Sequence, residues 1–441
     1  MRDFFRQLTI HQRRLAVVIA LILCVHVGIT AYHRTRKVGD FDVLRGFGAE
    51  LLRGDVLYAE GLCYNYMPIT ALYNMPSALT PAWIASIWRS LAALGCLALT
   101  VVWLKRMTPG SERSPREWFT LAALALLLAA HYIIRDLDDA GPHTILLAML
   151  IGGAYCLWQS RERWAAAWFG LAIALKMTPG LLLPFFVWKR QFRLAFYTGL
   201  ATAAWIALPA VWMGPQAWWT AQYQWTTSVA IRALSGESDH NEQRIQNQAL
   251  KPALERLLTT YAPDDRRKLD HPLDVPVLDL EPRTARAITG GVMLALLAAF
   301  AWQTWRPYQG PHDPARLSEF AGLLIMMTLF SPVTWLQHLP WVLPCTWLLV
   351  ERYRSTGLRD RTLQIGLGLY AFMVVVINRE LVGRETYYLL LSWHMHTLCQ
   401  LLLLGMLATT RRPAVSAYAT AIDDTSTAKF DAAPAAVRRA A

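Results

Sequence analysis

Long apolar runs separated by short charged stretches dominate the chain. A helix needs roughly 20 apolar residues to cross about 30 Å of hydrocarbon. The candidate spans are 15–32, 82–104, 118–134, 143–159, 194–212, 286–305, 317–334, 363–377 and 387–409, with a shorter run at 339–350. The pattern predicts an all-α polytopic integral membrane protein with roughly 10–12 transmembrane segments.

Residues 165–188 form a further apolar stretch, and this stretch decides the topology. Basic residues flank it on both sides, and Lys176 and Pro179 interrupt its middle. A lysine at the membrane midplane is costly, and a proline removes a hydrogen bond from a helix. We therefore predict two half-length helices that meet at this break and return the chain to the side where it entered. A single span would instead place the basic loops 306–316 and 351–361 outside, against the positive-inside rule.

The composition agrees with a membrane protein and excludes three other classes. Of the 441 residues, 55% are hydrophobic and 17% are charged, and the mean hydropathy is +0.27. Soluble domains contain about 25% charged residues. The chain is therefore not a soluble globular enzyme, a disordered protein or a secreted disulfide scaffold. Its six cysteines show no metal-ligand spacing, so we expect no metal site from them.

The net charge of +12 does not indicate nucleic-acid binding. The basic residues lie in short loops between apolar runs, where they orient a protein in the membrane. Four arginines precede the first apolar run, and no small-residue cleavage site follows it. We therefore interpret 15–32 as a retained helix whose N-terminus stays in the cytoplasm. With the hairpin at Lys176, both termini lie in the cytoplasm, and the protein is expected in the cell (plasma or inner) membrane as a multi-pass protein.

Three regions follow from this topology. Residues 1–14 form a cytoplasmic N-terminus, 15–409 form the transmembrane domain, and 410–441 form a disordered cytoplasmic tail. The domain carries two large extracytoplasmic loops, 33–81 and 213–285. The second loop contains a possible helix at QALKPALERLL. We see no internal repeat in the sequence.

Two carboxylates open the first outer loop. Asp40 and Asp42 lie at the predicted membrane–water boundary, where a carboxylate can act as a general base. Residues 41–53 have the apolar pattern of a helix in the interface. An Asp before such a helix often caps it, so Asp40 is either a cap, a base or both, and Asp42 is the alternative base.

Two further residues carry titratable groups near the predicted boundary. Lys176 is the one lysine in a predicted apolar span, where an ionisable group is a functional candidate and its natural partner is an anion such as a lipid phosphate. His338 lies next to Trp335 and Trp341, and its ring can donate to a phosphate oxygen or shuttle a proton. The alternatives are a lysine that reaches water from the hairpin tip and a histidine solvated among interfacial aromatics.

Two other charged or histidine-rich stretches invite a metal interpretation. The segment RDLDDAGPHT contains Arg135, Asp136 and His143, and its carboxylates could bind a metal, although solvated charges on a short loop explain them better. His394 and His396 are two residues apart and point about 200° apart on a helix, so we reject a shared ion there. We expect no metal and no cofactor.

Several stretches resemble the GT-C superfamily of membrane glycosyltransferases, and glycosyltransferase family 87 in particular. The family's first outer loop contains an Asp–Phe pair, a G-x-x-x-Y and a Y-x-P, which here are Asp40–Phe41, Gly54–Tyr58 and Tyr66–Pro68. The hairpin stretch AIALKMTPG, the loop element QNQAL and the segment SPVTWLQH are similar to further family elements. The chain departs from the family at Gln337, which replaces the first of two histidines, and at GPHT, which replaces a Gly-Gln-Asn element.

The resemblance implies a GT-C-like fold and a polyprenyl-phosphate-dependent hexosyltransferase, with mannose as the expected sugar. Asp40 matches the carboxylate that activates the acceptor hydroxyl. Lys176, His338 and Arg135 are the expected partners of the donor phosphate, and further substrate contacts are expected from Tyr66, Asn247 and Trp335. The expected partners are a polyprenyl-phosphate sugar donor, a glycolipid or glycan acceptor and the lipid bilayer, with no nucleic acid.

A transporter or flippase of lipid-linked sugars is the alternative from another class. Transporters often show two-fold symmetry in their spans, which this sequence lacks. A non-catalytic scaffold would leave Asp40, Lys176 and His338 on one side of the membrane without a reason.

Overall fold

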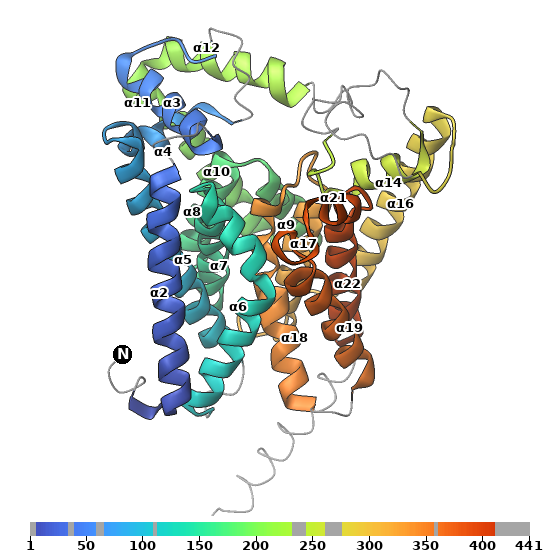
Figure 1. Ribbon diagram of the computed structural model, residues 1–441. Coiled ribbons are helices and arrows are strands. Elements are labelled where there is room, and N and C mark those ends of the chain that lie inside the picture. Colours follow the sequence, from blue (N-terminus) through green and yellow to red (C-terminus); the bar gives the residue numbers. More distant parts are fainter. Residues whose placement is uncertain are drawn as a thin grey trace, which may run out of the picture.

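The computed structural model describes residues 6–33, 39–58, 66–108, 113–231, 244–260, 276–356 and 360–410, and these residues form helices without a β-strand. Long helices run side by side, and shorter helices lie across one end of the bundle (Figure 1). The all-α polytopic class is thereby confirmed. The tail expected to be disordered and parts of both outer loops lie outside the described residues.

Five described helices or helix pairs are long and apolar enough to cross a membrane: α2 (Ile10–His33), α5 (Ala82–Met107), α6 (Pro115–Asp138), α10 with α11 (Phe192–Met213) and α16 (Pro282–Gln303). A sixth candidate consists of α21 (Arg384–Ser392) and α22 (Met395–Thr410), which are bent by 57° at their junction. The remaining predicted segments are shorter or broken, including α7 (His143–Trp158) and α19 with η6 (Arg361–Val376). The break between α21 and α22 falls at the WHMH stretch, so His394 and His396 do not share one regular helix.

The chain reverses at Lys176, as the hairpin interpretation predicted. Helix α8 (Glu162–Leu175) ends there, and η1 (Thr178–Leu181) and α9 (Leu182–Trp188) lead the chain back. Lys176 itself is extended, with φ −150° and ψ 125°. Arg193, at the start of α10 (Phe192–Ala207), lies 3.2 Å from the Glu162 carboxylate at the start of α8. Both arms of the hairpin therefore begin and end at the same end of the bundle.

The end of the bundle at the top of Figure 1 is covered by helices from the first and second predicted loops. Helix α3 (Asp40–Arg53) packs on α4 (Pro68–Ala78), and α11 (Ala210–Met213) and α12 (Pro215–Trp225) lie across the top of Figure 1, followed by η2 (Thr226–Ala230). The predicted helix in the second loop is present as α14 (Leu250–Leu258). Helix α3 buries the face that carries Phe41, Leu44 and Phe47, as its amphipathic pattern predicted.

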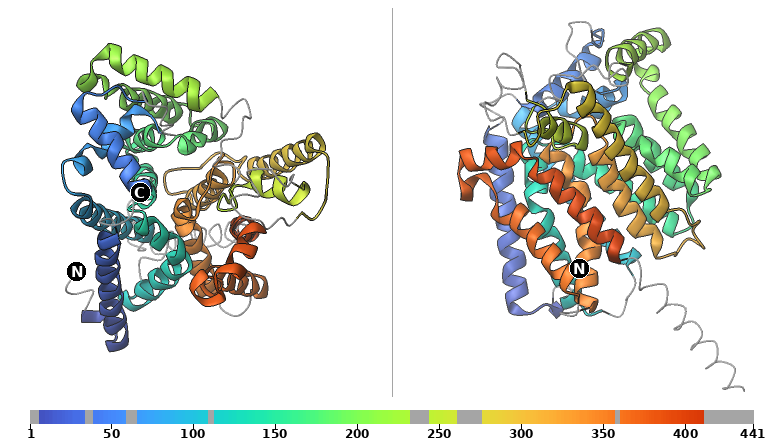
Figure 2. Two further views of the ribbon diagram at one scale, coloured as in Figure 1. Left: turned by 45° about the horizontal axis from the view of Figure 1, so that its top comes forward. Right: turned by 90° about the vertical axis from the view of Figure 1, so that its right-hand side faces the viewer.

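The C-terminal part of the chain packs beside the N-terminal part, as the colours in Figure 2 show. Its elements include α17 (Ala315–Leu329), η4 (Leu336–Val342), α18 (Leu343–Thr356) and α20 (Arg379–Val382). Helix α6 packs against both η4 and α18 and joins the two parts. Trp341 and Trp347 are among the largest buried side chains of this core.

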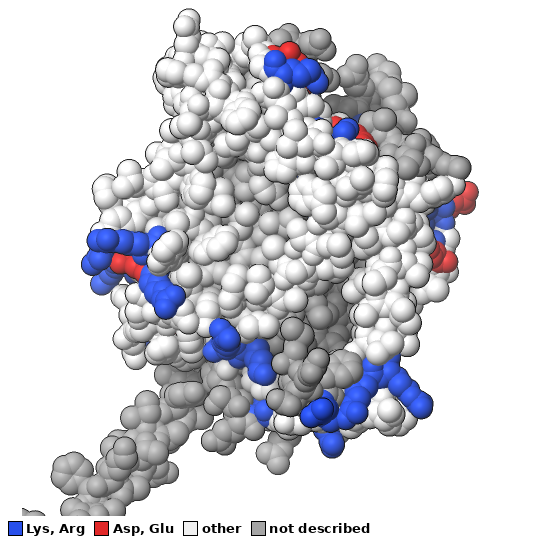
Figure 3. Space-filling view, turned by 90° about the vertical axis from the view of Figure 1, so that its left-hand side faces the viewer, with Lys and Arg blue, Asp and Glu red and all other residues white. Residues whose placement is uncertain are grey.

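The surface has the charge distribution of a membrane-embedded domain. Most of the face in Figure 3 is neither basic nor acidic. Lys and Arg side chains gather mainly along its lower and left margins, with smaller groups beside acidic side chains at the top and the right margin. The first helix, α2, presents Leu21 and Ile22 with 60% of each side chain exposed. A wide uncharged surface of this kind suits contact with lipid rather than water.

Gly48 sets the distance between α3 and α4. A Cβ atom there would lie 2.6 Å from the backbone carbon of Asn74. We expect Gly48→Leu to push the two helices apart and to destabilise the protein by about 1–3 kcal/mol. Gly95→Leu is the matched control, because a Cβ on Gly95 in α5 meets nothing within 4 Å. Thermal unfolding of the purified proteins checks this, and equal midpoints for the two variants would contradict it.

Candidate active site

Helix α3 begins with Asp40. The Asp40 side chain is exposed, whereas the next residue, Phe41, is buried. Phe41 is fully buried with Ala85 and Ala140, which anchors the start of the helix to the bundle. The backbone N–H groups at a helix N-terminus stabilise a nearby carboxylate. The first turn of α3 therefore holds the charge of Asp40 at the surface of this end of the bundle.

The capping role weighed for Asp40 is filled by Asp42. The Asp42 carboxylate accepts a hydrogen bond from the Gly39 N–H at 2.9 Å, one turn back at the N-terminus of the helix. Asp42 thus satisfies the backbone N–H of the residue that precedes the helix. Gly39 is the N-cap residue and Asp40 is the first residue of the helix, and the Asp40 carboxylate faces another segment.

That segment is η4, far along the sequence. The Gln337 side-chain amide donates a long hydrogen bond of 3.5 Å to Asp40 Oδ2. Gln337 is the residue that replaces the first histidine of the family element, and it precedes His338. The predicted base and one predicted phosphate partner are therefore brought together, although 298 positions separate Asp40 from His338.

A buried carboxylate lies at the centre of the site, and we did not expect it from the sequence. Asp136 has no exposed surface and accepts hydrogen bonds from the backbone N–H groups of His143 and Thr144 at 3.2 and 2.8 Å. Its Oδ1 atom also lies 3.1 Å from His143 Nδ1. The interpretation of Asp136 and His143 as solvated loop charges is thus wrong. The chain turns at Gly141, where a Cβ atom would lie 2.1 Å from Asp136 Oδ1, so the close approach needs glycine.

Lys176 is connected to the Asp136 carboxylate through His143. Its Nζ atom lies 2.9 Å from His143 Nε2. The ammonium can only donate, so Nε2 accepts and the ring proton lies on Nδ1, from which it is donated to Asp136. The three groups form a chain in which a neutral imidazole lies between a carboxylate and an ammonium. An ammonium has three donors, and the described contacts of Lys176 use one of them.

His338 lies on the other side of His143. The two ring centroids are 4.2 Å apart, and the Trp335 ring stacks on His338 with the centroids 6.2 Å apart. The Nδ1 atom of His338 contacts the Val333 carbonyl at 3.2 Å and the Trp335 N–H at 3.3 Å. Nδ1 can either donate to Val333 or accept from Trp335, and in the second case the ring proton lies on Nε2, which can then donate to a substrate oxygen. The predicted residues Lys176, His338 and Trp335 thus belong to one cluster.

Asn247 holds the segment that carries His338. It is fully buried, its amide donates to the Pro332 carbonyl at 2.9 Å, and its oxygen accepts from the Thr334 N–H at 2.8 Å. Trp341 adds a second tether, because its indole N–H donates to the His143 carbonyl at 3.1 Å. The irregular stretch between α17 and η4 is therefore fixed from both sides.

Tyr66 and Arg135 lie in different surroundings. Burial and the negative charge of Asp40 raise the pKa of Tyr66 to about 12, so its phenol stays protonated and can donate. Arg135 is 47% exposed and lies 3.4 Å from Asp138 on its own helix. Neighbouring residues of a helix project about 100° apart. Asp136 therefore points into the cluster, and Arg135 does not.

Sequence reasoning missed three members of this region. Asp136 and His143 were noticed but assigned to solvent, and Arg89 was not singled out. Arg89 lies inside the apolar run 82–104, so the signal was available: an ionisable residue in a membrane segment is a functional candidate. Among the residues that the structure describes, no group of three or more His, Cys, Asp or Glu could hold a metal ion.

Known proteins are similar to this chain in sequence. Residues 64–332 match the model of glycosyltransferase family 87. The chain is 28% identical over 375 residues to a polyprenol-phosphate-mannose-dependent alpha-(1-2)-phosphatidylinositol mannoside mannosyltransferase of Mycolicibacterium smegmatis, with 79% of this chain and 77% of the relative covered. A relative of the same name from Mycobacterium tuberculosis is 24% identical over 332 residues, with 69% and 68% covered. No solved structure matches the chain.

These matches support an enzyme rather than a transporter or a scaffold. The family match covers more than half of the chain, and it includes Tyr66, Lys176 and the loop that contains Asn247. The chain belongs to glycosyltransferase family 87.

Proposed function

We propose that this enzyme transfers mannose from a polyprenyl-phosphate donor to a glycolipid or glycan acceptor at the extracytoplasmic face of the membrane. Both relatives are named for a polyprenol-phosphate-mannose donor and a phosphatidylinositol mannoside acceptor. The observation that carries the proposal is the junction at Gln337 and His338. Gln337 contacts Asp40, and His338 faces His143, which contacts Lys176. One segment thus connects the Asp40 carboxylate with the cluster that contains the Lys176 ammonium.

Asp40 is the general base of the proposed reaction. Its carboxylate accepts the proton of the acceptor hydroxyl as that oxygen attacks the anomeric carbon of the donor. The bond from the anomeric carbon to the phosphate oxygen breaks, and polyprenyl phosphate leaves with the electron pair. A single displacement of this kind inverts the anomeric configuration, so a β-linked donor gives an α-linked product. Gln337 orients the carboxylate, and Asp42 is the alternative base.

Lys176 stabilises the leaving phosphate. The polyprenyl tail lies in the bilayer, so the phosphate must lie at headgroup depth, where a hairpin tip can reach it. Asp136 and His143 hold the ammonium in place and leave its remaining donors for phosphate oxygens. His338 adds its Nε2 atom, and Trp335 offers an aromatic ring beside it. Tyr66 and Asn247 complete the proposed set of substrate-site residues, with Asn247 acting through the His338 segment. Arg135, which we expected at the donor phosphate, is exposed and paired with Asp138 outside the cluster.

Asp40→Asn tests the base. We expect the rate of mannose transfer to fall about 10²–10⁴-fold, because an amide cannot accept the proton. Asp42→Asn is the matched control and should keep most activity, since Asn also accepts a backbone N–H at a helix N-terminus. The measurement is transfer of labelled mannose from polyprenyl-phosphate mannose to phosphatidylinositol mannoside by purified protein. Equal rates for Asp40→Asn and the wild type would refute the assignment, and loss in Asp42→Asn alone would exchange the two roles.

Lys176→Met tests the cation. The ammonium interacts with charge that develops on the phosphate, so its loss should lower kcat/KM for the donor by about 10²-fold. Lys176→Arg keeps the charge and should recover part of this loss. Arg135→Met removes a cation that is paired with Asp138 outside the cluster, and we expect less than about a tenfold loss. Steady-state kinetics with varied donor separates these variants, and a larger effect at Arg135 than at Lys176 would assign the phosphate to Arg135.

The proposed orientation can be tested with two exposed glutamines at opposite ends of the bundle. Gln216 lies on α12, and Gln309 lies in the loop between α16 and α17. In a cysteine-free variant we expect Gln216→Cys in intact cells to react with a membrane-impermeant maleimide, and Gln309→Cys to react only after the membrane is opened. The reverse pattern would place the active site in the cytoplasm.

A further inference from the structure

Gln248 is a buried side-chain amide at the place where α21 ends and α22 begins. It follows Asn247 in the second predicted loop and has no exposed surface. Burying an amide is costly unless its polar atoms have hydrogen-bond partners. The partners of Gln248 therefore indicate what the residue does.

The Gln248 amide connects the ends of the two helices. Its Nε2 atom donates to the Leu391 carbonyl in the last turn of α21 at 3.0 Å, and also to the Ile245 carbonyl in its own loop at 2.8 Å. Its Oε1 atom accepts from the His396 N–H in the first turn of α22 at 3.2 Å. Such terminal carbonyl and N–H groups have no partner within their own helix. One amide thus satisfies a group on each side of the 57° bend.

The backbone of Gln248 connects this junction with the segment that carries His338. Its N–H donates to the Thr334 carbonyl at 2.6 Å. Its carbonyl accepts from the Thr397 hydroxyl at 2.9 Å and from the Gln400 amide at 3.2 Å, both on α22. Thr334 precedes His338 by four residues. Gln248 is therefore bonded to α22 on one side and to the backbone near His338 on the other.

Helix α22 provides a fixed support for this connection. It packs against α17, α18 and α19, and the Thr328 hydroxyl on α17 donates to the Gln400 side-chain oxygen at 2.6 Å. The stretch between α17 and η4, in contrast, is not helical. A stretch without helical hydrogen bonds must bond its backbone groups to other segments. The contacts of Asn247 and Gln248 with Thr334 therefore help to decide where η4 begins.

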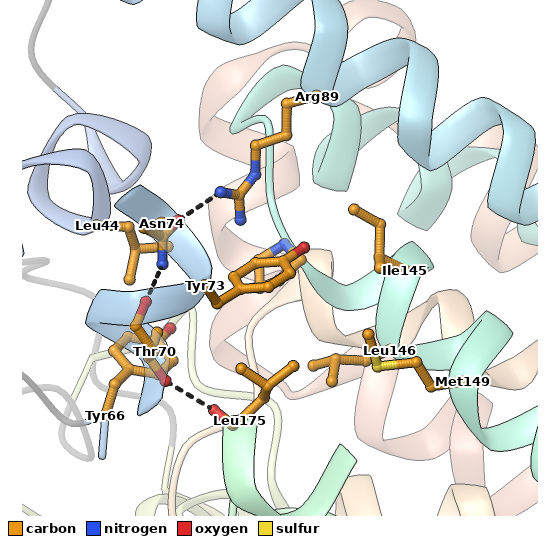
Figure 4. A pocket seen from close by; sticks show the side chains of 11 residues that line it. Leu44, Tyr66, Thr70, Tyr73, Asn74, Arg89, Ile145, Leu146, Met149 and Leu175 are labelled. Atoms are coloured by element: carbon orange, nitrogen blue, oxygen red, sulfur yellow. Dashed lines mark hydrogen bonds between the residues drawn. The ribbon is translucent and has the colours of Figure 1, made fainter. Parts of the chain in front are cut away.

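A second buried amide makes comparable contacts near Lys176. The Asn74 side chain accepts a hydrogen bond from Arg89 and donates to the Thr70 carbonyl at 2.7 Å (Figure 4). The Thr70 hydroxyl then donates to the carbonyl of Leu175, the residue before Lys176, at 3.3 Å. Backbone next to each proposed phosphate partner is thus bonded to a residue that a buried amide holds.

We propose that Gln248 is a positioning residue for His338. Its side-chain amide is anchored at the junction of α21 and α22, and its backbone N–H holds Thr334 just before η4, whose third residue is His338. This inference rests on the proposed function, because the donor phosphate is the group that His338 is proposed to contact. A misplacement of about 1 Å can lower a rate about 10²-fold, so a residue without substrate contact can limit the reaction.

Gln248→Met tests the positioning role. Methionine has a similar length but lacks the amide that bonds to Leu391 and His396, so we expect kcat for mannose transfer to fall by about 10–10²-fold. The loss should shrink to less than about threefold when His338 is already alanine, because the ring that Gln248 positions is then absent. An unchanged kcat, or a loss that stays equally large in the His338→Ala background, would overturn the proposal.

Two threonine variants provide a milder test in case Gln248→Met does not fold. Thr397→Val removes the hydroxyl that donates to the Gln248 carbonyl, and it should lower kcat by about threefold or more. Thr346→Val is the matched control, because Thr346 is also buried but its hydroxyl donates to the Ala125 and Leu343 carbonyls. We expect this control to keep kcat within about twofold of the wild type. Equal kcat values for the two variants would contradict the role of Gln248.

Hydrogen exchange reports on the segment without turnover. The Thr334 N–H is bonded to Asn247, and we expect Gln248→Met or Thr397→Val to raise exchange in peptides that cover 331–342, by about tenfold or more in Gln248→Met. Peptides from α5 should remain unchanged. Unaltered exchange in 331–342 would refute the proposal. Because this measurement needs no mannose transfer, a wild-type protein without transfer would refute the proposed function, and the exchange result would still decide whether Gln248 holds the segment.

Discussion

The contact between Asp136 and His143 is the interaction on which the rest of the candidate site depends. A carboxylate without exposed surface is tolerated because two backbone N–H groups and an imidazole donate to it. The imidazole then presents its acceptor nitrogen to Lys176, so the buried negative charge reaches the ammonium through one neutral ring. The tip of the hairpin, the start of α7 and the ring of His338 are all positioned by this chain of contacts.

Interrupted helices supply the places where these groups meet. The break at Lys176 places its ammonium at the tip of two half-length helices. The irregular stretch before η4 brings Gln337 and His338 to the N-terminus of α3. Broken helices within a membrane domain are tolerated where protein rather than lipid satisfies the backbone. Asn247 does this for the second break, because its side chain bonds to the backbone of Pro332 and Thr334. The irregular backbone is thus part of the proposed catalytic design.

Much of the fold could be predicted because lipid imposes simple rules on sequence. Apolar runs, basic flanks and the Lys176–Pro179 interruption predicted the spans and the hairpin, and the amphipathic run 41–53 predicted α3. The candidate site was predicted less completely. Residues with a resemblance to a family element, such as Asp40, Lys176 and His338, were found. Asp136 and His143 were not, because in the sequence a buried ionic partner looks the same as a solvated loop charge. Arg89 was missed although its position inside the apolar run 82–104 marked it as a candidate.

The sequence by itself determined that the protein lies in a lipid bilayer and that its secondary structure is helical. Its apolar runs are too long and too uncharged for any environment except a bilayer, and its breaks require helices that end within the domain. Only the tertiary structure decided which charges face one another. Gln337 reaches Asp40, and Asp136 reaches Lys176 through His143, across separations that no local pattern encodes. Side-chain partners depend on which helix faces meet, and this is decided by packing of the whole bundle rather than by the residues near each charge.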